Sequence, residues 1–237
     1  MKTTEELKQL NIILPPPEQI TGYKGVYNRY VKRALDFVFA AVAVVLLSPL
    51  ILLTAASVAL CSGFPVFYRA ERCGYLGKAV RIFKFRTMVK NADKIGGGTT
   101  ALNDPRITRV GRFLRKTKMD ELANLFNIIR GEMSFVGPRP ELLRYTKLYS
   151  GEEEYILKVR PGITDFSSCT FINLDEIVGS ENADEMYEKY VLEKKNKLRI
   201  RYAKEVSFGT DVSLFFKTVT AVLKKAMRVV GKSNREK

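Results

Sequence analysis

The sequence predicts an α+β protein that is mostly helical, contains a small β-hairpin or sheet, and attaches to a membrane. Three observations predict this fold class: a long uncharged apolar segment, two strand-like runs joined by a short turn, and several amphipathic helix patterns. We divide the 237 residues into an N-terminal lead-in (1–31), a membrane segment (32–62) and a remainder (63–237) that ends in a basic amphipathic helix.

The lead-in contains the stretch ILPPPEQITGYKG, which has three prolines and no sustained hydrophobic period. Proline and glycine clusters of this kind interrupt regular structure. We interpret residues 1–31 as flexible or loosely docked.

The membrane segment contains no charged residue from Phe37 to Ser62. Its roughly 26 residues would span about 39 Å as one straight helix, more than the roughly 30 Å of hydrocarbon in a bilayer. The segment is too long, and lies too far from the N-terminus, to be a cleaved signal peptide. It therefore belongs in a membrane.

Ser48 and Pro49 interrupt this segment. Pro49 has no N–H, so the carbonyl of Val45 loses its helical partner, and in lipid a neighbour, a serine hydroxyl or water must satisfy it. Basic residues mark the cytoplasmic side, and here they flank both ends. The residues alone fit two arrangements equally well: a re-entrant helix that bends at Ser48-Pro49 and returns, or a kinked single span. The flanking basic residues are Arg29, Lys32 and Arg33 before the segment, and Arg69, Arg72, Lys78, Arg81, Lys84 and Arg86 after it.

A β-hairpin is predicted directly after the membrane segment. The runs PVFYRAERCG and KAVRIFKFRTM are aromatic and β-branched, and GYLG separates them. The polar stretch NADKIGGGTTALNDPR follows, and its three glycines lack the GK[ST] of a phosphate-cradling P-loop. We expect it to form a loop.

Two helices are predicted after this loop. The stretch DPRITRVGRFLRK repeats arginine every three residues, which would make a basic stripe beside an apolar one on a helix. The stretch DELANLFNIIRG places its apolar residues on one helical face and ends in Gly131. The basic stripe comprises Arg106, Arg109, Arg112 and Arg115, and the apolar face comprises Leu122, Leu125, Phe126 and Ile129.

The C-terminal third begins with EYILKVRPGIT, remains polar to about Asn182, and continues as a charged, helix-like run through Lys204. The final run, DVSLFFKTVTAVLKKAMRVVGK, mixes apolar residues with lysines and an arginine. This pattern suits a helix on an anionic membrane surface or a helix packed against the core. Its apolar residues are Leu214, Phe215, Val219, Val222, Met227 and Val230.

The composition limits the chemistry. The chain has 40 Lys and Arg against 25 Asp and Glu, a formal net charge of +15, which points to nucleic acid, anionic lipid or a phosphate-bearing substrate. It has no histidine, which excludes Ser-His and Cys-His nucleophile pairs and histidine-ligated zinc. Cys61, Cys73 and Cys169 form no CxxC motif, so we expect a reducing compartment and no structural zinc site.

Asp120 and Glu121 are the first candidates for chemistry because they precede the clearest predicted helix. A carboxylate in a first helical turn is kept ionised by the helix dipole and can act as a nucleophile or metal ligand. The same helix end attracts phosphate. A structural alternative is that Thr117 and Asp120 form part of a capping box.

Arg139 is the second candidate. It lies between two prolines in SFVGPRPE, so its backbone is stiff. A fixed guanidinium fork suits a diphosphate or a carboxylate. An exposed arginine in a proline-rich turn explains the pattern equally well.

The order of these motifs resembles the bacterial sugar transferases, the small monotopic polyprenyl-phosphate phosphoglycosyl transferases. The resemblance rests on KRALDFVFAAVAVVLLSP, FYRAERCGYLGKAVRIFKFRTM, NDPRITRVGRFLRKTKMDELANLFNIIRGEMSFVGPRPE and RPGIT. It is close from Tyr30 to Thr164 and continues more weakly through YAKEVSFGTDVSLFFKT. Several motifs in a fixed order make it far more specific than any one of them.

The resemblance implies a reaction. A sugar 1-phosphate moves from a nucleoside diphosphate sugar, usually a UDP-sugar, to polyprenyl phosphate, with release of UMP, as the first membrane step of a glycan pathway. Asp120 would attack the β-phosphate and form a covalent phosphoglycosyl intermediate, and Glu121 would help to hold Mg²⁺. A carboxylate nucleophile with Mg²⁺ and arginines needs no histidine.

Further roles follow from matching positions. The resemblance implies phosphate binding by Arg115 and Arg139 and a basic pair at the same site from Lys84 and Arg86; Asp211 matches an acidic position near the end of the family core. It also implies that Ser48-Pro49 breaks a re-entrant helix, and that residues 63–237 form a catalytic domain on the cytoplasmic face of the bacterial inner membrane, with interfacial amphipathic helices.

The resemblance also implies the partners: a nucleoside diphosphate sugar, polyprenyl phosphate and membrane lipid, with no nucleic acid and with a homodimer as a candidate assembly. The chain lacks the additional N-terminal spans of larger members, so we expect the minimal catalytic form. The competing hypothesis is a non-catalytic, basic, membrane-associated protein that binds anionic lipid or nucleic acid. The long apolar segment argues against nucleic acid.

One departure from the family pattern concerns the segment after RPGIT. Many members continue with a glycine and a stretch that ends in Asn-Gly-Arg. Here Asp165 occupies the glycine position, and no equivalent arginine follows. That arginine is therefore not assigned to this chain.

Overall fold

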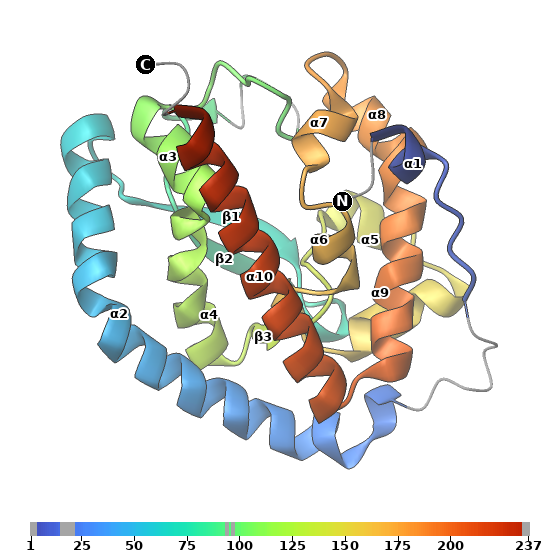
Figure 1. Ribbon diagram of the computed structural model, residues 1–237. Helices are drawn as coiled ribbons and strands as arrows, with labels where there is room; N and C mark the ends of the chain where they lie inside the picture. Colours follow the sequence, from blue (N-terminus) through green and yellow to red (C-terminus); the bar gives the residue numbers. More distant parts are fainter. Residues whose placement is uncertain (1–3, 15–21, 93–94, 96–97, 234–237) are drawn as a thin grey trace.

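In the computed structural model, residues 4–14, 22–92, 95 and 98–233 are described, with side chains as far as residue 222. The predicted fold class is confirmed in outline, because the chain is mostly helical with two small sheets (Figure 1). Most of the proline-rich lead-in stretch and two of the three loop glycines lie outside the described residues.

The long apolar helix is the largest element of the first half. A π-helical turn, η3 (Tyr27–Val31), leads directly into α2 (Lys32–Ser62). By length and composition the continuous helix Tyr27–Ser62 could cross a membrane. Figure 1 shows that α2 is bent, so that it curves around the other elements.

Ser48 satisfies the carbonyl that Pro49 leaves without a helical partner. Its hydroxyl donates to the carbonyl oxygen of Val45 at 2.8 Å, which is one of the solutions that the sequence predicts. The helix therefore passes through Pro49 without an unpaired carbonyl at that position.

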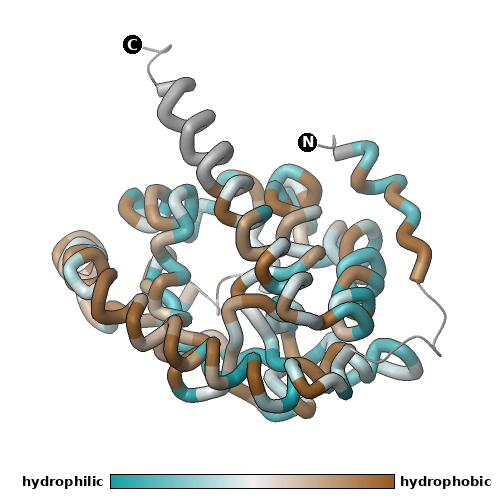
Figure 2. The backbone as a smooth tube through the Cα atoms, turned by 60° about the horizontal axis from the view of Figure 1, so that its bottom comes forward, coloured by the Kyte–Doolittle hydropathy of each residue, from teal (hydrophilic) through white to brown (hydrophobic). Residues whose placement is uncertain are grey.

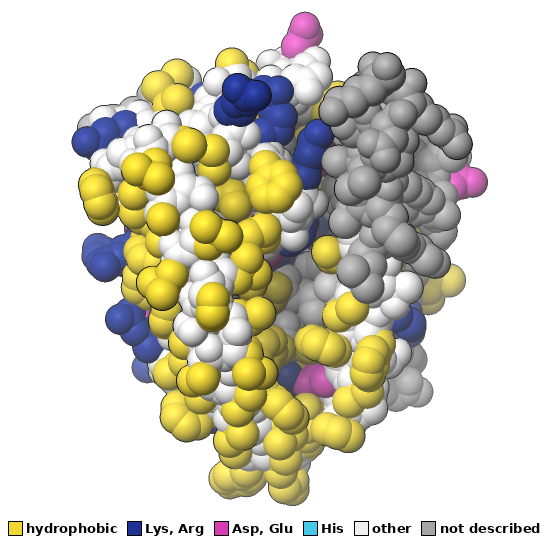
Figure 3. All heavy atoms as spheres, turned by 60° about the vertical axis from the view of Figure 1, so that its left-hand side comes forward, with side chains coloured by type: hydrophobic (Ala, Val, Ile, Leu, Met, Phe, Trp, Pro, Cys, Tyr) yellow, Lys and Arg dark blue, Asp and Glu magenta, His cyan; other side chains and the backbone are white. Residues whose placement is uncertain are grey.

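Most of the apolar surface of α2 faces outward. Leu46 is 73% exposed and Leu60 is 87% exposed, whereas Ala40, Ile51 and Val58 are buried against the body of the protein. Figure 2 shows hydrophobic residues along most of α2, and Figure 3 shows them covering its outer face. Exposed apolar surface of this extent marks an interaction surface.

The predicted hairpin is confirmed. Strand β1 (Phe67–Cys73) pairs antiparallel with β2 (Ala79–Phe85), from Phe67 opposite Phe85 to Cys73 opposite Ala79. The short 3₁₀ turn η4 (Tyr75–Gly77) joins the strands. The inner face of the hairpin shares a hydrophobic core with α2 and α4.

The two predicted helices after the loop are α3 (Arg109–Thr117) and α4 (Asn124–Arg130), joined by the 3₁₀ turn η6 (Met119–Ala123). Gly131 ends α4 in the left-handed conformation, with φ of 81°, as the sequence predicts. Lys118 separates α3 from η6 and is also left-handed, with φ of 61°. This reversal directs the Asp120 turn away from the axis of α3.

Two sequence interpretations of this region are wrong. The basic stripe is not continuous on a helix, because α3 begins only at Arg109, and Arg106 pairs with Asp104 before the helix. Thr117 does not cap the following turn, because its hydroxyl donates back to the carbonyls of Phe113 and Leu114. The sequence pattern alone did not reveal the break at Lys118.

A second pair of strands forms a separate, parallel two-stranded sheet. Strands β3 (Ser134–Val136) and β4 (Gly162–Thr164) are paired, and the segment between them contains α5 (Leu143–Thr146) and the 3₁₀ turn η7 (Gly151–Lys158). Gly162 packs so closely that a Cβ there would lie 2.2 Å from the backbone nitrogen of Gly137. Only glycine permits this approach.

The C-terminal region forms a helical layer. Short helices α6 (Phe166–Thr170), α7 (Leu174–Val178) and α8 (Ala183–Tyr187) are followed by the π-helical turn η8 (Glu188–Leu192) and α9 (Glu193–Glu205). In the N-terminal lead-in, α1 (Thr4–Lys8) buries Leu7 against this layer, and η2 (Gly22–Lys24) precedes η3.

The final helix, α10 (Phe208–Ser233), packs against the core on one side, as one of the two sequence alternatives predicts, and exposes apolar side chains on the other. Leu214 is buried against the core, whereas Phe216 is 63% exposed and Phe215 is 44% exposed. The space-filling view shows hydrophobic side chains on the described part of α10, across a hollow from α2 (Figure 3). The side chains of Met227 and Val230 lie outside the described residues.

Candidate active site

Asp120 and Glu121 lie in η6, directly after the left-handed Lys118. Both are largely buried, with exposed fractions of 6% and 9%. Buried carboxylates require partners or a function, because desolvation of a charge is costly. The two side chains meet this requirement differently.

Glu121 is held by two cations. Arg139 forms a two-pronged contact, with Nη2 at 2.5 Å from Oε1 and Nη1 at 3.2 Å from Oε2, and Lys84 Nζ lies 3.3 Å from Oε1. Burial alone would raise the pKa of Glu121, but the charges of Arg139 and Lys84 outweigh it and hold that pKa well below its usual value. Glu121 is therefore ionised.

Asp120 has a free oxygen. Its Oδ1 is buried without a hydrogen-bond partner among the described residues. Burial raises the pKa of Asp120, and Glu121 raises it further, while Lys84, Lys118 and Arg115 oppose the shift. An unpaired carboxylate oxygen surrounded by cations is arranged for reaction or ligand binding rather than for stability.

Arg115 approaches this site from the last turn of α3. Two threonines hold its guanidinium: Nε donates to Thr87 at 2.8 Å and Nη1 donates to Thr100 at 3.0 Å. Burial lowers the pKa of Arg115, and the charge of Asp120 opposes that shift. The side chain therefore contributes positive charge beside Asp120 without forming a direct ion pair with it.

Lys84 and Arg86 leave the end of the hairpin in different directions. Lys84 reaches Glu121, whereas Arg86 donates to the backbone carbonyls of Ser62 and Gly63 at the C-terminal end of α2. Positive charge is favourable at the C-terminus of a helix. The contacts of Arg86 thus join α2 to the hairpin that carries Lys84.

Asp211 lies in a separate buried cluster. It accepts hydrogen bonds from Tyr27 at 2.7 Å and Tyr202 at 2.6 Å, and it pairs with Lys32. These contacts join the start of α2 to α9 and α10. Of the six other predicted site residues, the structure brings Lys84, Arg115, Asp120, Glu121 and Arg139 together, and it places Arg86 at the end of α2.

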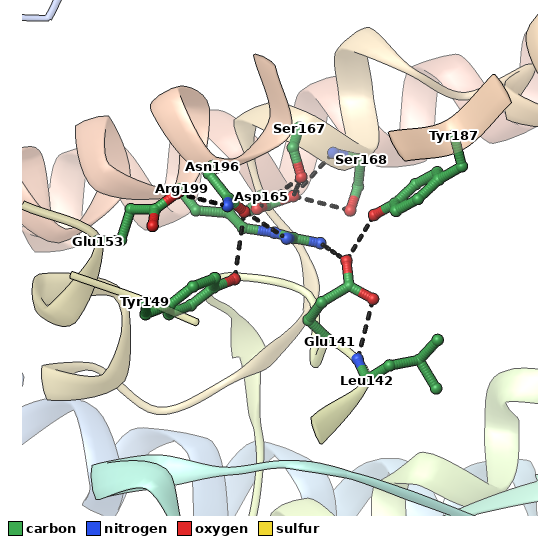
Figure 4. A network of polar contacts seen from close by, with 10 residues as sticks. All are labelled: Glu141, Leu142, Tyr149, Glu153, Asp165, Ser167, Ser168, Tyr187, Asn196 and Arg199. Carbon is green, nitrogen blue, oxygen red and sulfur yellow. Dashed lines mark hydrogen bonds and ion pairs between the residues drawn. The ribbon is translucent and has the colours of Figure 1, made fainter. Parts of the chain in front are cut away.

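The Pro138–Arg139–Pro140 segment is anchored on both sides. Before Arg139, the N–H of Gly162 donates to the carbonyl of Pro138 at 3.0 Å. After it, Glu141 accepts from Arg199 of α9 at 3.0 Å and from Tyr187 of α8 at 2.5 Å (Figure 4). Arg139 itself also donates to the carbonyl of Ile163 at 2.9 Å. Prolines alone do not position this arginine.

Glu141 and Arg199 form an ion pair inside the protein. Arg199 is 1% exposed, and its Nη1 also donates to Asn196 at 2.9 Å. Sequence reasoning missed this pair, although Glu141 directly follows the proline–arginine–proline motif. The partner lies 58 residues further along the chain.

The described contacts of Asp165 also give it a structural role. It is fully buried and caps α6 by accepting from the backbone N–H of Ser168 at 2.7 Å and from the hydroxyl of Ser167. The residue at which this sequence departs from the family pattern therefore starts a helix close to Arg199 (Figure 4). Aspartate is among the best N-cap residues.

Arg33 joins α2 to α4, the helix after the turn that carries the two carboxylates. From the first turns of α2, its guanidinium donates to the carbonyls of Ile128 and Ile129, both at 2.7 Å. These carbonyls lie in the last turn of α4, the helix that follows Asp120 and Glu121. In the sequence, the basic flank before the apolar segment was the only signal for this contact.

The residues of this site could supply only part of the oxygen ligands that Mg²⁺ needs. No group of three or more potential His, Cys, Asp or Glu ligands occurs among the described residues. Mg²⁺, however, typically uses one or two carboxylates together with substrate phosphates and water. The unpartnered Oδ1 of Asp120 is available for it, whereas both oxygens of Glu121 contact cations.

Comparison with known proteins gives one family. A family model described as bacterial sugar transferase matches residues 27–225. A UDP-glucose:undecaprenyl-phosphate glucose-1-phosphate transferase of Escherichia coli is 38% identical over 217 residues, which cover 90% of this chain and 44% of that protein. An exopolysaccharide production protein, ExoY, of Rhizobium meliloti is 37% identical over 221 residues, covering 87% of this chain and 91% of that protein.

A UDP-N-acetylgalactosamine-undecaprenyl-phosphate N-acetylgalactosaminephosphotransferase of Aeromonas hydrophila is 33% identical over 218 residues, which cover 91% of this chain and 47% of that protein. The chain therefore spans less than half the length of two of these three relatives, and most of the length of ExoY.

Proposed function

Because the chain belongs to the bacterial sugar transferase family, we propose that it transfers a sugar 1-phosphate from a UDP-sugar to polyprenyl phosphate. The products are UMP and a polyprenyl diphosphate sugar. The observation that carries the proposal is the buried, unpartnered Asp120 oxygen among Lys84, Arg115 and Arg139. The names of the E. coli and Aeromonas relatives describe the same reaction class with glucose and N-acetylgalactosamine.

The proposed reaction has two steps. In the first, a carboxylate oxygen of Asp120 bonds to the β-phosphorus of the donor, and the bond from that phosphorus to the bridging oxygen breaks, so UMP leaves with the oxygen. In the second, a phosphate oxygen of the lipid attacks the same phosphorus and Asp120 is released as carboxylate. Covalent catalysis thus divides one displacement into two easier ones.

The surrounding residues stabilise charge in both steps. Arg115 and Lys84 would bind the phosphoryl oxygens, and their positions beside Asp120 support this role; Arg139 holds Glu121 in the same site. Fixed cations in a buried site act strongly because little solvent screens them. Bound Mg²⁺ would supply further charge neutralisation at the diphosphate.

The proposal includes a re-entrant α2, with both ends on the cytoplasmic side. The bend in α2 (Figure 1) supports it, and so do contacts at both of its ends. Arg33 near the first end binds α4, and Ser62 at the other end binds Arg86 after β2. Strand β2 and α4 are joined by Asn127. Since one compact body holds both ends of α2, they would lie on one side of the bilayer.

Assays of UMP release test the catalytic proposal. With undecaprenyl phosphate and Mg²⁺, one or more members of a UDP-sugar panel are expected to give continuous UMP release. Without the lipid acceptor, release should stop at no more than one UMP per protein molecule, because Asp120 remains modified. Salt-sensitive nucleic-acid binding with no Mg²⁺-dependent turnover would instead support a non-catalytic basic binder.

Cysteine labelling tests the topology. In a background without Cys61, Cys73 and Cys169, we expect Tyr30→Cys and Leu76→Cys to react with a membrane-impermeant maleimide from the cytoplasmic side. Both native side chains are exposed, at 65% and 58%. Leu46→Cys, on the lipid-facing surface of α2, serves as the control and should be protected on both sides. Labelling of positions 30 and 76 from opposite sides would refute the re-entrant arrangement.

A further inference from the structure

Asn124 is a buried polar residue that the fold does not explain. It is the first residue of α4 and only 1% exposed. Its side-chain oxygen is buried without a hydrogen-bond partner among the described residues. Buried amides are normally hydrogen-bonded, so such an exception requires a reason.

Asn127 provides a comparison within the same helix. It is fully buried, and its Oδ1 accepts from the N–H of Phe83 at 2.8 Å while its Nδ2 donates to the carbonyl of Arg81 at 2.9 Å and to Glu132 at 2.6 Å. These bonds attach α4 to β2. The two asparagines are similarly buried on one helix. Asn127 has a structural role, whereas the oxygen of Asn124 makes no hydrogen bond with the described residues.

The position of Asn124 relates it to the carboxylates. It follows Glu121 by three residues and Asp120 by four, across the junction of η6 and α4. Residues three apart share a side of a 3₁₀ turn, and residues three or four apart share a side of an α-helix. Asp120 Oδ1 is likewise buried and unpartnered. Both oxygens of Glu121 are already in contact with Arg139 or Lys84. The free acceptors on this side are therefore those of Asp120 and Asn124.

Two neighbouring acceptors need a ligand that brings positive charge or hydrogen-bond donors. Carboxylate and amide oxygens are suitable ligands for a hard divalent cation. The nearby Lys84, Arg115 and Arg139 would bind the anionic phosphates that accompany such a cation. An amide oxygen can take the place of a further carboxylate in a site with few acidic ligands.

We propose that Asn124 is a further ligand-binding residue: its amide oxygen and the free oxygen of Asp120 together face the divalent cation of a bound nucleoside diphosphate, directly or through the cation's water shell. This inference rests on the proposed function, because the cation enters with the diphosphate. It explains why α4 keeps an unpaired amide next to the carboxylate turn. Unsatisfied buried groups of this kind are retained where a ligand completes them.

The test compares Asn124→Ala with Asn127→Ala in the full-length protein. Without metal, we expect the melting temperature of Asn124→Ala to be no more than about 2 °C below that of wild type, because no described hydrogen bond is lost. Asn127→Ala should melt at least about 5 °C lower, because three are lost. Mn²⁺ binding in the presence of UDP, followed by electron paramagnetic resonance, should weaken at least about tenfold in Asn124→Ala and strengthen in Asn124→Asp.

The outcomes separate this inference from the proposed function. The inference is overturned if Asn124→Ala is destabilised as much as Asn127→Ala, or if it keeps the Mn²⁺ affinity of wild type. It is also overturned if the wild-type protein binds no Mn²⁺ in the presence of UDP. A wild-type protein that binds Mn²⁺ but releases no UMP from any UDP-sugar overturns the proposed function alone. In an active enzyme, the Mg²⁺ concentration for half-maximal rate should rise about tenfold or more in Asn124→Ala.

Discussion

Asp120→Asn is expected to reduce UMP release by about 1,000-fold or more, because an amide cannot replace the carboxylate that forms the covalent bond. Stability should hardly change, since Oδ1 of Asp120 has no hydrogen-bond partner among the described residues to lose. The measurement is steady-state UMP release, together with the intact mass of the protein quenched after mixing with the UDP-sugar. Wild type should gain the mass of a sugar phosphate, and the variant should not.

A matched control is available in α7. Asp175→Asn makes the same chemical change at an exposed carboxylate, and it should retain both turnover and the adduct. If Asp120→Asn turned over at the wild-type rate, or carried the adduct, Asp120 would not be the nucleophile. Loss of activity together with a lower melting temperature would indicate misfolding, and retention of the fold is therefore checked on the same samples.

Glu141→Gln is expected to lower the free energy of unfolding by about 3–5 kcal/mol at neutral pH. The substitution leaves the guanidinium of Arg199 buried without its carboxylate partner, and Arg199 is only 1% exposed. Denaturant unfolding of both proteins measures the difference. Glu185→Gln, at an exposed position on α8, is the control and should change stability by less than about 0.5 kcal/mol.

The same pair predicts a pH dependence. Burial would raise the pKa of Glu141, but Arg199, Lys195 and the hydrogen bond from Tyr187 lower it from its usual 4.5 to about 2. A carboxyl group with a lowered folded-state pKa contributes stability above its unfolded-state pKa and loses that contribution as the pH falls toward the folded-state value. The stability difference between wild type and Glu141→Gln should therefore shrink from about pH 4.5 down to pH 2. A difference that stays constant over this range would contradict an ionised Glu141.

Local patterns in the sequence were sufficient to predict several structural elements. The alternating apolar residues on either side of GYLG predicted the β1–β2 hairpin, and Gly131 marked the end of α4. Ser48-Pro49 predicted a carbonyl without a helical partner, and the serine hydroxyl, one of the three groups expected to satisfy it, does so. Each of these features depends on residues close together in the chain, so both partners of each interaction lie within one short stretch of sequence.

The features that the sequence did not predict also have a physical explanation. Lys118 adopts a left-handed conformation that lysine rarely takes. This break separates Thr117 from the Asp120 turn, so the alternative of a capping box does not hold. The pairing of three-residue strands β3 and β4 gave no periodic signal. The support of Arg139 by Glu141 and Arg199, and the contact of Arg33 with α4, join segments separated by tens of residues.

By itself the sequence determined the apolar helix with its proline, the hairpin, the carboxylate pair and the stiff arginine, because covalent neighbours and short-range periodicity specify them. Only the tertiary structure decided which oxygens are paired and which are free. It pairs Glu121 with Arg139 and Lys84, and it places Arg86 at the end of α2. It leaves one side-chain oxygen each of Asp120 and Asn124 without a hydrogen-bond partner among the described residues. Those assignments depend on distances between segments remote in sequence, and packing of the folded chain alone sets such distances.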